Sequence, residues 1–365
     1  MDTHFYSLEV SKIVRETEDA VSIFFSVPDN LKETFTYLPG QYITLRFMLG
    51  GSEQRRAYSI CTSPVHNELA ITVKRVEKGL VSKHIVEKVQ IGYTLQVMPP
   101  QGHFIANPNH EQRKTYYLFG AGSGITPLIS ILKTVLEKEP ASTVHLLYGN
   151  RNEDSIIFKN ALDELLKTYE GQIFVEHILS APKREKSGGL GGLFSKGKIN
   201  WKGAVGRVDK TSIEKFLENH PKRTADTAYY ICGPSDMMQT IENVLTDKKI
   251  DKKNIHLEYF KTPETAVGVE NAMGSAQVTV SLRHTKHNIT VGKNEIILDE
   301  LIKRKIDAPY SCTSGACSTC MAKLTKGTVK MRACFALDDD EVKAGYILVC
   351  QSVPTSEEVE LTFDF

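Results

Sequence analysis

The sequence predicts a multidomain protein with an antiparallel β-barrel, an α/β domain built on a parallel sheet, and a small α+β domain. Three observations lead to this prediction. The chain has 365 residues, more than one ordinary core contains. Its strand and helix patterns change once, near residue 116, and a cysteine-rich segment lies near the end. We expect domains at 1–108, 109–261 and 276–365, with a linker at 262–275.

The first domain has the pattern of short β-strands. Residues 42–47 and 69–76 alternate apolar and polar side chains, and Pro-Gly and Ser-Pro dipeptides separate such runs. Many short strands without intervening helices are typical of a closed antiparallel sheet. The pattern therefore predicts a compact β-barrel.

The second domain alternates apolar strands with segments that have helical spacing. Strands that alternate with helices indicate a parallel sheet with helices on its faces. The expected strands are 115–120, 144–150, 173–179 and 228–232, and the expected helices are 128–138, 161–169 and 237–245. In the last domain, a hairpin at 278–291 and a helix at 297–305 precede the cysteines.

Charge and hydropathy narrow the classes of partner. The chain has 45 basic and 44 acidic residues, so its net charge is +1, and we expect neither nucleic acid nor a membrane surface as a partner. No run approaches the 18 or so apolar residues of a membrane span. The N-terminus lacks the basic and apolar stretches of a signal peptide, so we expect a cytoplasmic location.

Four of the seven cysteines form a pattern that points to a metal centre. Cys312, Cys317 and Cys320 have the x4 and x2 spacing of a plant-type 2Fe-2S cluster, and Cys350 follows as the expected fourth ligand. Cys334 is the competing fourth ligand. A four-cysteine zinc site is the alternative, but such sites favour two paired C-x2-C units, and this segment has one.

The cysteine segment at 311–327 resembles a plant-type ferredoxin, and the 260 residues upstream resemble the ferredoxin–NADP reductase superfamily. The order of the three domains resembles the reductase components of bacterial oxygenases, and most of all the phenylacetyl-CoA epoxidase type. This resemblance implies a flavin-binding barrel, a nicotinamide-binding α/β domain and a β-grasp ferredoxin domain.

The flavin site is expected on one strand of the barrel. Arg56, Ala57, Tyr58 and Ser59 match the R-x-Y-S motif of this superfamily. An arginine can pair with a flavin phosphate, a tyrosine can stack on the flavin, and Ser59 can hydrogen-bond flavin N5. By itself the motif would also suit an ordinary strand with an exposed arginine.

Two further segments favour the flavin interpretation. Residues 39–42 resemble the P-G-Q-Y element that supports the barrel beside the cofactor. Gly79, Leu80, Val81 and Ser82 resemble the helix start whose backbone amides hold the pyrophosphate. We expect FAD rather than FMN, although similar scaffolds use FMN.

A glycine-rich turn follows the first strand of the α/β domain and opens a helix. Gly120, Gly122, Gly124 and Thr126 match the G-x-G-x-T-P pattern of the reductase superfamily, with Ile125 where a Rossmann motif has its last glycine. Small residues let the backbone approach a dinucleotide at the helix N-terminus. The alternative is a tight turn without a ligand.

Two later segments complete the expected hydride-transfer site. Cys232, Gly233 and Pro234 resemble the C-G-P element, in which the cysteine lies near the nicotinamide C4. Glu258 and Phe260 resemble the segment in which the aromatic ring shields the flavin, although a surface strand is the ordinary interpretation. The resemblance implies catalytic roles for Ser59, Cys232 and Glu258.

The choice of dinucleotide depends on the end of the second parallel strand. Arg151 can pair with a 2′-phosphate, which favours NADPH. Glu153 and Asp154 lie close by, and an acidic residue there would favour NADH. We expect NADPH.

The resemblance implies an oxidoreductase that passes electrons from NADPH through FAD and a 2Fe-2S cluster to a partner oxygenase. The expected partner is a diiron oxygenase of the phenylacetyl-CoA epoxidase type. Two alternatives stay open: a reductase for a fatty-acid desaturase or another hydroxylase, and a redox-sensing iron–sulfur protein without catalysis.

Overall fold

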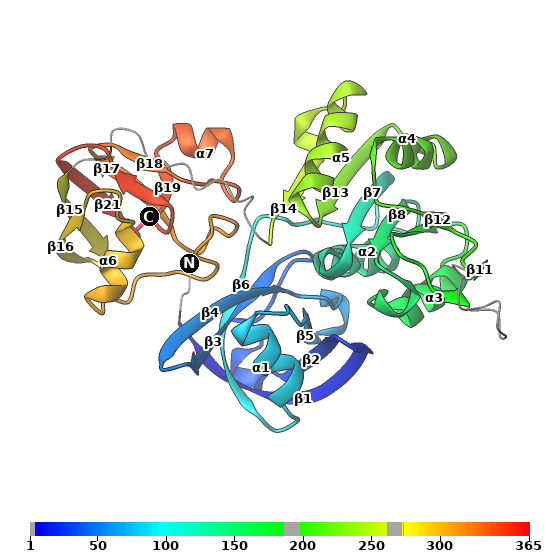
Figure 1. Cartoon of the computed structure of the whole chain (residues 1–365), viewed down its shortest axis with the longest axis horizontal. Helices are drawn as coiled ribbons and strands as arrows, with labels where there is room; N and C mark the ends of the chain where they lie inside the picture. The colour runs from blue at the N-terminus through cyan, green and yellow to red at the C-terminus, as the bar shows by residue number, and fades with distance from the viewer. Residues whose placement is uncertain (1–3, 186–197, 261–271, 273) are drawn as a thin grey trace, which may run out of the picture.

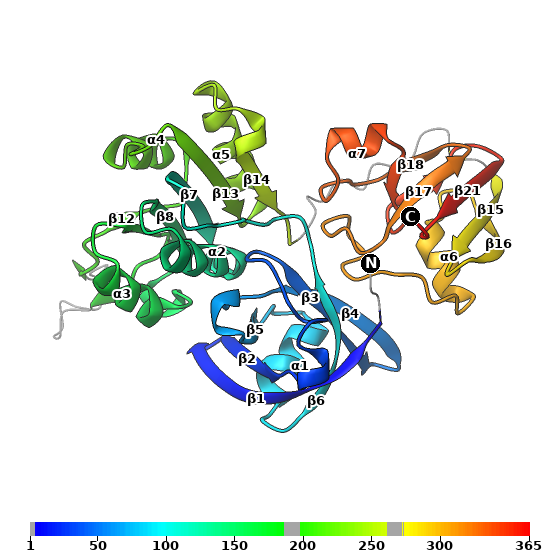
Figure 2. The same ribbon diagram turned by 180° about the vertical axis from the view of Figure 1, so that it is seen from behind.

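The computed structural model describes residues 4–185, 198–260, 272 and 274–365. Three domains follow one another along the chain, and Figures 1 and 2 show them as three lobes. In Figure 1 the barrel lies below, the α/β domain above it on the right and the C-terminal domain above it on the left. The C-terminal domain contacts the barrel between Thr319 and Tyr42 and the α/β domain between Asp339 and Lys252. The expected linker at 262–275 falls almost entirely outside the described residues.

The first domain is the expected antiparallel barrel. Its strands pair in the order β4-β3-β6-β1-β2-β5, every pairing is antiparallel, and a bridge between Ile60 and Ile71 joins the two end strands. Inward residues such as Ile23, Ile43 and Leu45 are fully buried, which is why these segments alternate in sequence. Its elements are β1 (Tyr6–Thr17), β2 (Ala20–Ser26), β3 (Tyr42–Leu49), β4 (Ser52–Ser59), β5 (Leu69–Lys74), α1 (Leu80–Lys88) and β6 (Thr94–Gln101).

The second domain has the expected parallel sheet, in the order β12-β9-β8-β7-β13-β14. All eight residues of β8 are buried, as a strand covered on both faces requires. Helices α2 and α3 pack against one face, and α4 and α5 against the other. Its elements are β7 (Lys114–Ala121), α2 (Ile125–Lys138), β8 (Thr143–Asn150), α3 (Lys159–Thr168), β9 (Ile173–Leu179), β10 (Arg184–Glu185), β11 (Lys198–Ile199), β12 (Ala204–Val205), α4 (Lys210–Asn219), β13 (Asp226–Cys232), α5 (Ser235–Asp247) and β14 (Ile255–Glu258).

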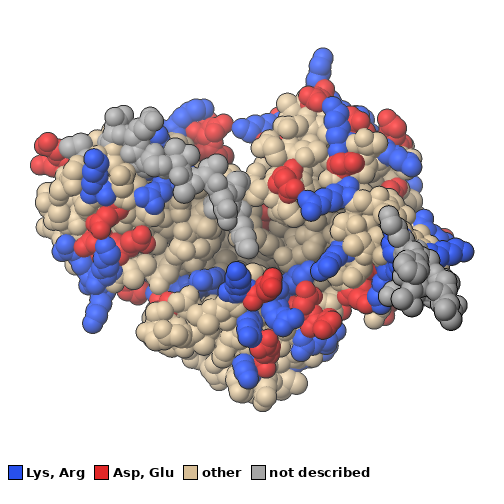
Figure 3. Space-filling model, viewed as in Figure 1, with Lys and Arg blue, Asp and Glu red and all other residues tan. Residues whose placement is uncertain are grey.

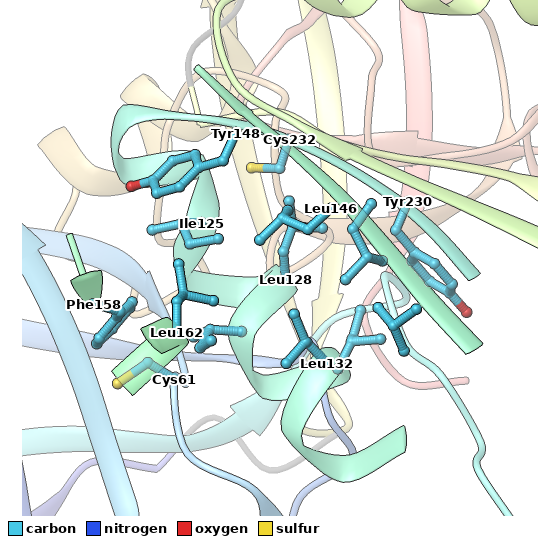
Figure 4. Packing of buried hydrophobic residues seen from close by; sticks show 14 of the residues in the cluster. Cys61, Ile125, Leu128, Leu132, Leu146, Tyr148, Phe158, Leu162, Tyr230 and Cys232 are labelled. Carbon is cyan, nitrogen blue, oxygen red and sulfur yellow. The ribbon is translucent and has the colours of Figure 1, made fainter. Parts of the chain in front are cut away.

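The barrel and the α/β domain share one hydrophobic core. Cys61 of the barrel belongs to the same buried cluster as Leu128 and Leu132 of α2 (Figure 4). Ser130 of α2 donates a hydrogen bond to the carbonyl of Thr62 at 2.6 Å. Because apolar and polar contacts both cross this boundary, the two domains keep a fixed relative orientation at the edge where the glycine-rich turn begins.

The C-terminal domain is a β-grasp fold, in which a five-stranded mixed sheet packs on one helix. The expected hairpin is β15 with β16, and it turns at Arg283 and His284, both with positive φ. The loop with Cys312, Cys317 and Cys320 lies between helix α6 and strand β17. Its elements are β15 (Ser275–Leu282), β16 (Thr285–Gly292), α6 (Ile297–Lys303), β17 (Met321–Lys326), β18 (Val329–Met331), α7 (Asp339–Lys343), β19 (Tyr346–Leu348), β20 (Ser352–Pro354) and β21 (Glu358–Thr362).

The surface carries charges of both signs. Figure 3 shows Lys and Arg interspersed with Asp and Glu over the face that it presents, in agreement with the net charge of +1. None of the described helices combines the length and the apolar character needed to cross a membrane.

Strand β8 contains several buried polar side chains without a hydrogen-bond partner among the described residues, and His145 is the one that can titrate. The ring of His145 is 1% exposed and lies between the rings of Tyr117 and Phe174, with centroids 5.2 and 5.1 Å away. Neither ring nitrogen has a hydrogen-bond partner among the described residues. Burial lowers the pKa of His145 to about 4, and the nearby His220 and Arg223 contribute to the lowering. The ring is therefore neutral in the folded protein.

His145 makes folding stability depend on pH. Below the ordinary histidine pKa of about 6.5, His145 binds a proton in the unfolded chain but stays neutral in the folded chain. The free energy of unfolding therefore falls as the pH drops from about 6.5 toward 4. We expect His145→Phe to remove up to about 2 kcal/mol of the stability loss between pH 7.5 and pH 5. Urea unfolding followed by the fluorescence of Trp201, the single tryptophan, reports on this domain. Exposed His110→Gln is the control, and an unchanged pH profile in His145→Phe would contradict this assignment.

Candidate functional site

The R-x-Y-S segment forms the C-terminal half of strand β4. In the β3–β4 ladder, Ser59 pairs with Tyr42 and Arg56 pairs with Leu45. Arg56 is exposed, and its guanidinium donates to the backbone oxygen of Arg55 at 2.7 Å. Ser59 is buried, while Tyr58 is half-buried, and burial raises the pKa of the Tyr58 hydroxyl. The strand thus offers an accessible cation at one end and a buried hydroxyl at the other.

Helix α1 begins close to this strand at the glycine that the sequence singles out. Gly79 is the N-cap of α1, and a Cβ there would lie 2.4 Å from Ser82 Oγ and 2.9 Å from Val76 Cβ. Ser82 Oγ accepts a hydrogen bond from the Val76 amide at 3.1 Å. Leu80 is exposed, whereas Val81 packs into the barrel core. Only glycine permits this tight entry, which leaves the first amides of α1 open to an anion.

The glycine-rich turn between β7 and α2 approaches the C-G-P segment very closely. A Cβ on Gly124 would lie 2.1 Å from the carbonyl oxygen of Cys232, and one on Gly233 would lie 3.3 Å from the Ala121 amide. Gly122 has a φ of +54° and open space around it. The glycines therefore bring two strand ends together and leave room above them.

A cavity of about 690 Å³ opens above these strand ends. It brings together six of the residues expected to bind cofactor. They are Gly122, Gly124, Arg151, Gly233, Pro234 and Phe260. Lys74 and Val76 of the barrel also line it, so the cavity lies between the two domains. Its position at the carboxyl ends of parallel strands is where α/β sheets bind nucleotides.

Sequence reasoning missed several residues of this cavity, and three of them have polar side chains near the end of β8 or in the loops beside it. Ser180, Arg207 and Asn150 line it, from the loops after β9 and β12 and from the end of β8. The side-chain amide oxygen of Asn150 is buried and has no hydrogen-bond partner among the described residues. An orphaned buried amide facing a cavity suits a polar ligand. The position of Asn150 at the strand end was the only available signal.

Other expected residues lie behind the cavity rather than in its wall. Thr126 is buried, and its hydroxyl donates to Ser123 O at 3.0 Å, which closes the first turn of α2. A Cβ on Gly120 would lie 3.0 Å from a Leu128 methyl. These two residues shape the turn. The flavin residues of β4 and α1 also lie outside this wall, in the barrel.

The acidic residues next to Arg151 are engaged elsewhere. Asp154 forms an ion pair with Lys183 Nζ at 2.5 Å. Glu153 accepts a hydrogen bond from the Lys183 backbone amide at 3.0 Å. Arg151, in contrast, lines the cavity together with Arg207. The cavity wall also contains Lys74 and Asp236, and the Asp236 carboxylate lies 4.0 Å from Arg207, so basic side chains outnumber acidic ones in the wall by three to one.

The four expected cluster ligands converge within the C-terminal domain. The Cys312 sulfur interacts with those of Cys317 and Cys350, and the Cys350 sulfur interacts with that of Cys320. These contacts between thiols lower the pKa of Cys312 and raise that of Cys350. Cys334 is half-buried, and burial is the main cause that raises its pKa. The arrangement groups Cys350, rather than Cys334, with the loop cysteines.

The loop around these cysteines fits an iron–sulfur cluster. The hydroxyl of Ser318 is buried without a hydrogen-bond partner among the described residues, and it lies between two ligands in sequence. The Ser314 amide donates to the Cys312 sulfur at 3.4 Å. Gly315 has a φ of +77°, and a Cβ there would lie 2.8 Å from Ala333 O. Orphaned donors and a tight backbone are what cluster sulfurs require.

Glu258 is the point at which the nicotinamide and cluster elements meet. It ends β14, next to Cys232 of β13 in the parallel ladder. Burial raises the pKa of Glu258 to about 8, and the nearby Cys312 sulfur contributes. Burial, with the charge of Glu258, also raises the pKa of Cys232, so its thiol stays protonated and is no nucleophile.

Three families of domain match the chain in the expected order. The oxidoreductase FAD-binding domain matches residues 7–105, the oxidoreductase NAD-binding domain matches 118–243, and the 2Fe-2S iron–sulfur cluster binding domain matches 280–355. FAD and a 2Fe-2S cluster are therefore cofactors of this chain, and a nicotinamide dinucleotide is its small-molecule partner.

Curated relatives extend over the whole chain. One of them, a component of the 1,2-phenylacetyl-CoA epoxidase of Escherichia coli K12, is 38% identical over 99% of this chain and 98% of the relative. The ferredoxin reductase component of 3-ketosteroid-9-alpha-monooxygenase from Rhodococcus rhodochrous is 33% identical over 98% and 96%. Among solved structures, phthalate dioxygenase reductase has the same fold, with a TM-score of 0.57, 24% identity and 98% of each chain covered.

The grouping of the cysteines separates the two candidates for the fourth ligand. We expect Cys350→Ser to abolish the cluster and leave the flavin bound, because its sulfur closes the ligand set. Cys334→Ser is the matched control and should leave both cofactors in place. Absorbance and electron paramagnetic resonance of the reduced protein measure cluster content, and the reverse pattern of loss would make Cys334 the ligand.

Proposed function

The chain belongs to the family of oxygenase reductases that join FAD-binding, NAD-binding and 2Fe-2S domains in one polypeptide, and from this premise we propose that it delivers electrons from NADPH to the diiron oxygenase of a phenylacetyl-CoA epoxidase system. The observation that carries the proposal is the 38% identity to the Escherichia coli epoxidase component along almost the whole length of both chains. A cytoplasmic location is part of the proposal.

The cofactors supply the redox chemistry: FAD accepts the two electrons of a hydride, and the cluster carries electrons singly. The protein binds, orients and shields them. When FAD is bound, Arg56 would pair with a flavin phosphate, the amides at the start of α1 would hold the pyrophosphate, and Ser59 would hydrogen-bond flavin N5. Phe260 would shield the flavin, which is consistent with its partial exposure at the cavity.

The hydride-transfer roles rest on the crowding at the C-G-P segment. Gly233 and Pro234 line the cavity and would admit the nicotinamide ring close to the backbone, and the buried Cys232 supports the wall behind them. Glu258 is adjacent to Cys232 and close to the cluster loop. Its carboxyl group, protonated or ionised, therefore lies between the nicotinamide site and the cluster site. Cys312, Cys317, Cys320 and Cys350 hold the cluster.

The preference for NADPH follows from the positive charge at the end of β8. Arg151 faces the cavity, whereas the neighbouring acidic residues bind Lys183. A 2′-phosphate there gains a charge-assisted pair, while the 2′-hydroxyl of NADH finds no acidic acceptor from those two residues.

We expect Arg151→Ala to weaken NADPH binding about ten- to hundredfold, since hydrogen bonds to charged groups contribute about 1.5–3 kcal/mol. NADH binding should change less than threefold. Steady-state kinetics with both dinucleotides measure the ratio. Lys159→Ala is the control, because Lys159 is an exposed cation of the same domain that pairs with Asp163. An equal loss for both dinucleotides would remove the support for NADPH.

A second candidate acceptor has its own support. The relative from Rhodococcus rhodochrous, named as a component of a steroid monooxygenase, is 33% identical over nearly the whole chain. Other oxygenases, hydroxylases and desaturases therefore stay as alternative acceptors for the same electron path.

The acceptor is tested by reconstitution. We expect the purified protein to reduce cytochrome c with NADPH without any partner, and to support epoxidation of phenylacetyl-CoA when the oxygenase components of that system are added. The oxygenase of a steroid monooxygenase serves as the matched control and should give little product. Product formed only with the steroid oxygenase would make a steroid monooxygenase the acceptor. Absence of NADPH oxidation with every acceptor would show that the protein is not an NADPH-dependent reductase.

A further inference from the structure

Arg55, the residue before the R-x-Y-S motif, makes a buried ion pair between the barrel and the ferredoxin domain. Its side chain is 5% exposed. Nη2 donates to Asp307 Oδ1 at 3.0 Å, and Nε donates to Glu53 Oε1 at 2.7 Å. The guanidinium also lies over the ring of Tyr310, 4.1 Å from its centroid. Asp307 and Tyr310 belong to the ferredoxin domain, more than 250 residues away in sequence.

These contacts close into a ring that spans both domains. The Tyr310 hydroxyl donates to Glu53 Oε1 at 3.1 Å, so the ferredoxin domain contacts both members of the barrel's own ion pair. Arg283 pairs with the second oxygen of Asp307 at 3.3 Å. A buried guanidinium is costly unless its donors are paired. Arg55 therefore favours the arrangement in which the ferredoxin domain stays docked.

Two residues of the neighbouring strand β3 also contact the cysteine loop. Thr44 Oγ1 donates to Ser311 Oγ at 2.9 Å, directly before Cys312. The Tyr42 hydroxyl and Thr319 Oγ1 are 2.9 Å apart, and Thr319 lies between two ligand cysteines. Thr319 also donates to Gln101 Oε1 of β6 at 3.0 Å. We call the contacts of Arg55 with Asp307 and Tyr310 the Arg55 clamp. The Arg55 clamp and the contacts of β3 and β6 together hold the cluster loop against the barrel.

The same ladder leads to the flavin strand. Tyr42 pairs with Ser59, the residue expected at flavin N5, and Arg46 pairs with Arg55 in the middle of β4. The loop that holds the cluster thus rests on the strand next to the flavin strand. Alternation along β4 directs Arg56 to the exposed side and Arg55 to the interface.

A second ion pair between domains differs in kind. Lys252 of the α/β domain lies 3.2 Å from Asp339 of α7, but their side chains are 81% and 77% exposed. Exposed pairs of this type contribute little and are screened by salt. It provides the matched control for Arg55.

From these contacts we propose that Arg55 is the positioning residue that docks the ferredoxin domain for electron transfer from FAD to the 2Fe-2S cluster. The inference rests on the proposed function, because it assumes that NADPH reduces the flavin. One hydride supplies two electrons, each reduction of the cluster consumes one, and the acceptor protein reoxidises the cluster between them.

The test compares Arg55→Gln with Asp307→Asn in the full-length holoprotein. Stopped-flow absorbance measures flavin reduction by NADPH, and rapid freeze-quench paramagnetic resonance measures cluster reduction. We expect flavin reduction within twofold of the wild type in both variants. Cluster reduction should slow at least tenfold in Arg55→Gln and about threefold in Asp307→Asn, whose carboxylate is 59% exposed. Arg55→Lys, which keeps the charge without the planar fork, should lie between them.

Small-angle X-ray scattering adds a readout that is independent of catalysis. The radius of gyration should increase in Arg55→Gln and stay at the wild-type value in Asp339→Asn, which should also reduce its cluster at the wild-type rate. Wild-type cluster reduction in both clamp variants, or an equal loss in Asp339→Asn, would overturn the role of Arg55. Failure of NADPH to reduce the wild-type flavin would instead refute the proposed function, and the scattering comparison would still decide whether Arg55 docks the domain.

Discussion

The contact between the cysteine loop and strands β3 and β6 is the constraint on which the rest of this structure depends. Tyr42 and Gln101 of the barrel both meet Thr319 of the loop, and Glu258 of the α/β domain lies near Cys312. Single-electron transfer needs redox centres within short reach. The three domains satisfy this need because their site-bearing edges converge here, and the shared core around α2 keeps two of them in a constant relation.

Strand β4 shows how one segment can serve two sites. Side chains alternate across a strand, so consecutive arginines face opposite environments. Arg56 remains exposed, whereas Arg55 is buried against the ferredoxin domain. A change that shifted the register by one residue would exchange the two environments, placing Arg56, the proposed phosphate-binding cation, in the interface. Flavin binding and domain docking therefore constrain the same strand.

Much of the fold was predictable because its signals are local. Alternating strands in the barrel, buried runs in the parallel sheet and the cysteine spacing each lie within a few residues of one another. The wall of the dinucleotide cavity was only partly predictable. Arg151 and the glycines stand beside recognisable patterns, but Ser180 and Arg207 enter from the ends of separate strands. The pairing of Arg55 with Asp307 could not be predicted, because it joins residues 252 positions apart.

The even distribution of charge limits how the domains can recognise one another. With a net charge of +1 and, in residues 276–365, 12 acidic and 11 basic side chains, neither surface provides a strong field for steering. A ferredoxin domain on the same chain does not need one, since the covalent connection supplies a high effective concentration. A few well-formed contacts then suffice to select one orientation, and a buried guanidinium fork is more selective than exposed lysine pairs. It follows that orientation here depends on geometry at β3 and β4, and little on ionic strength.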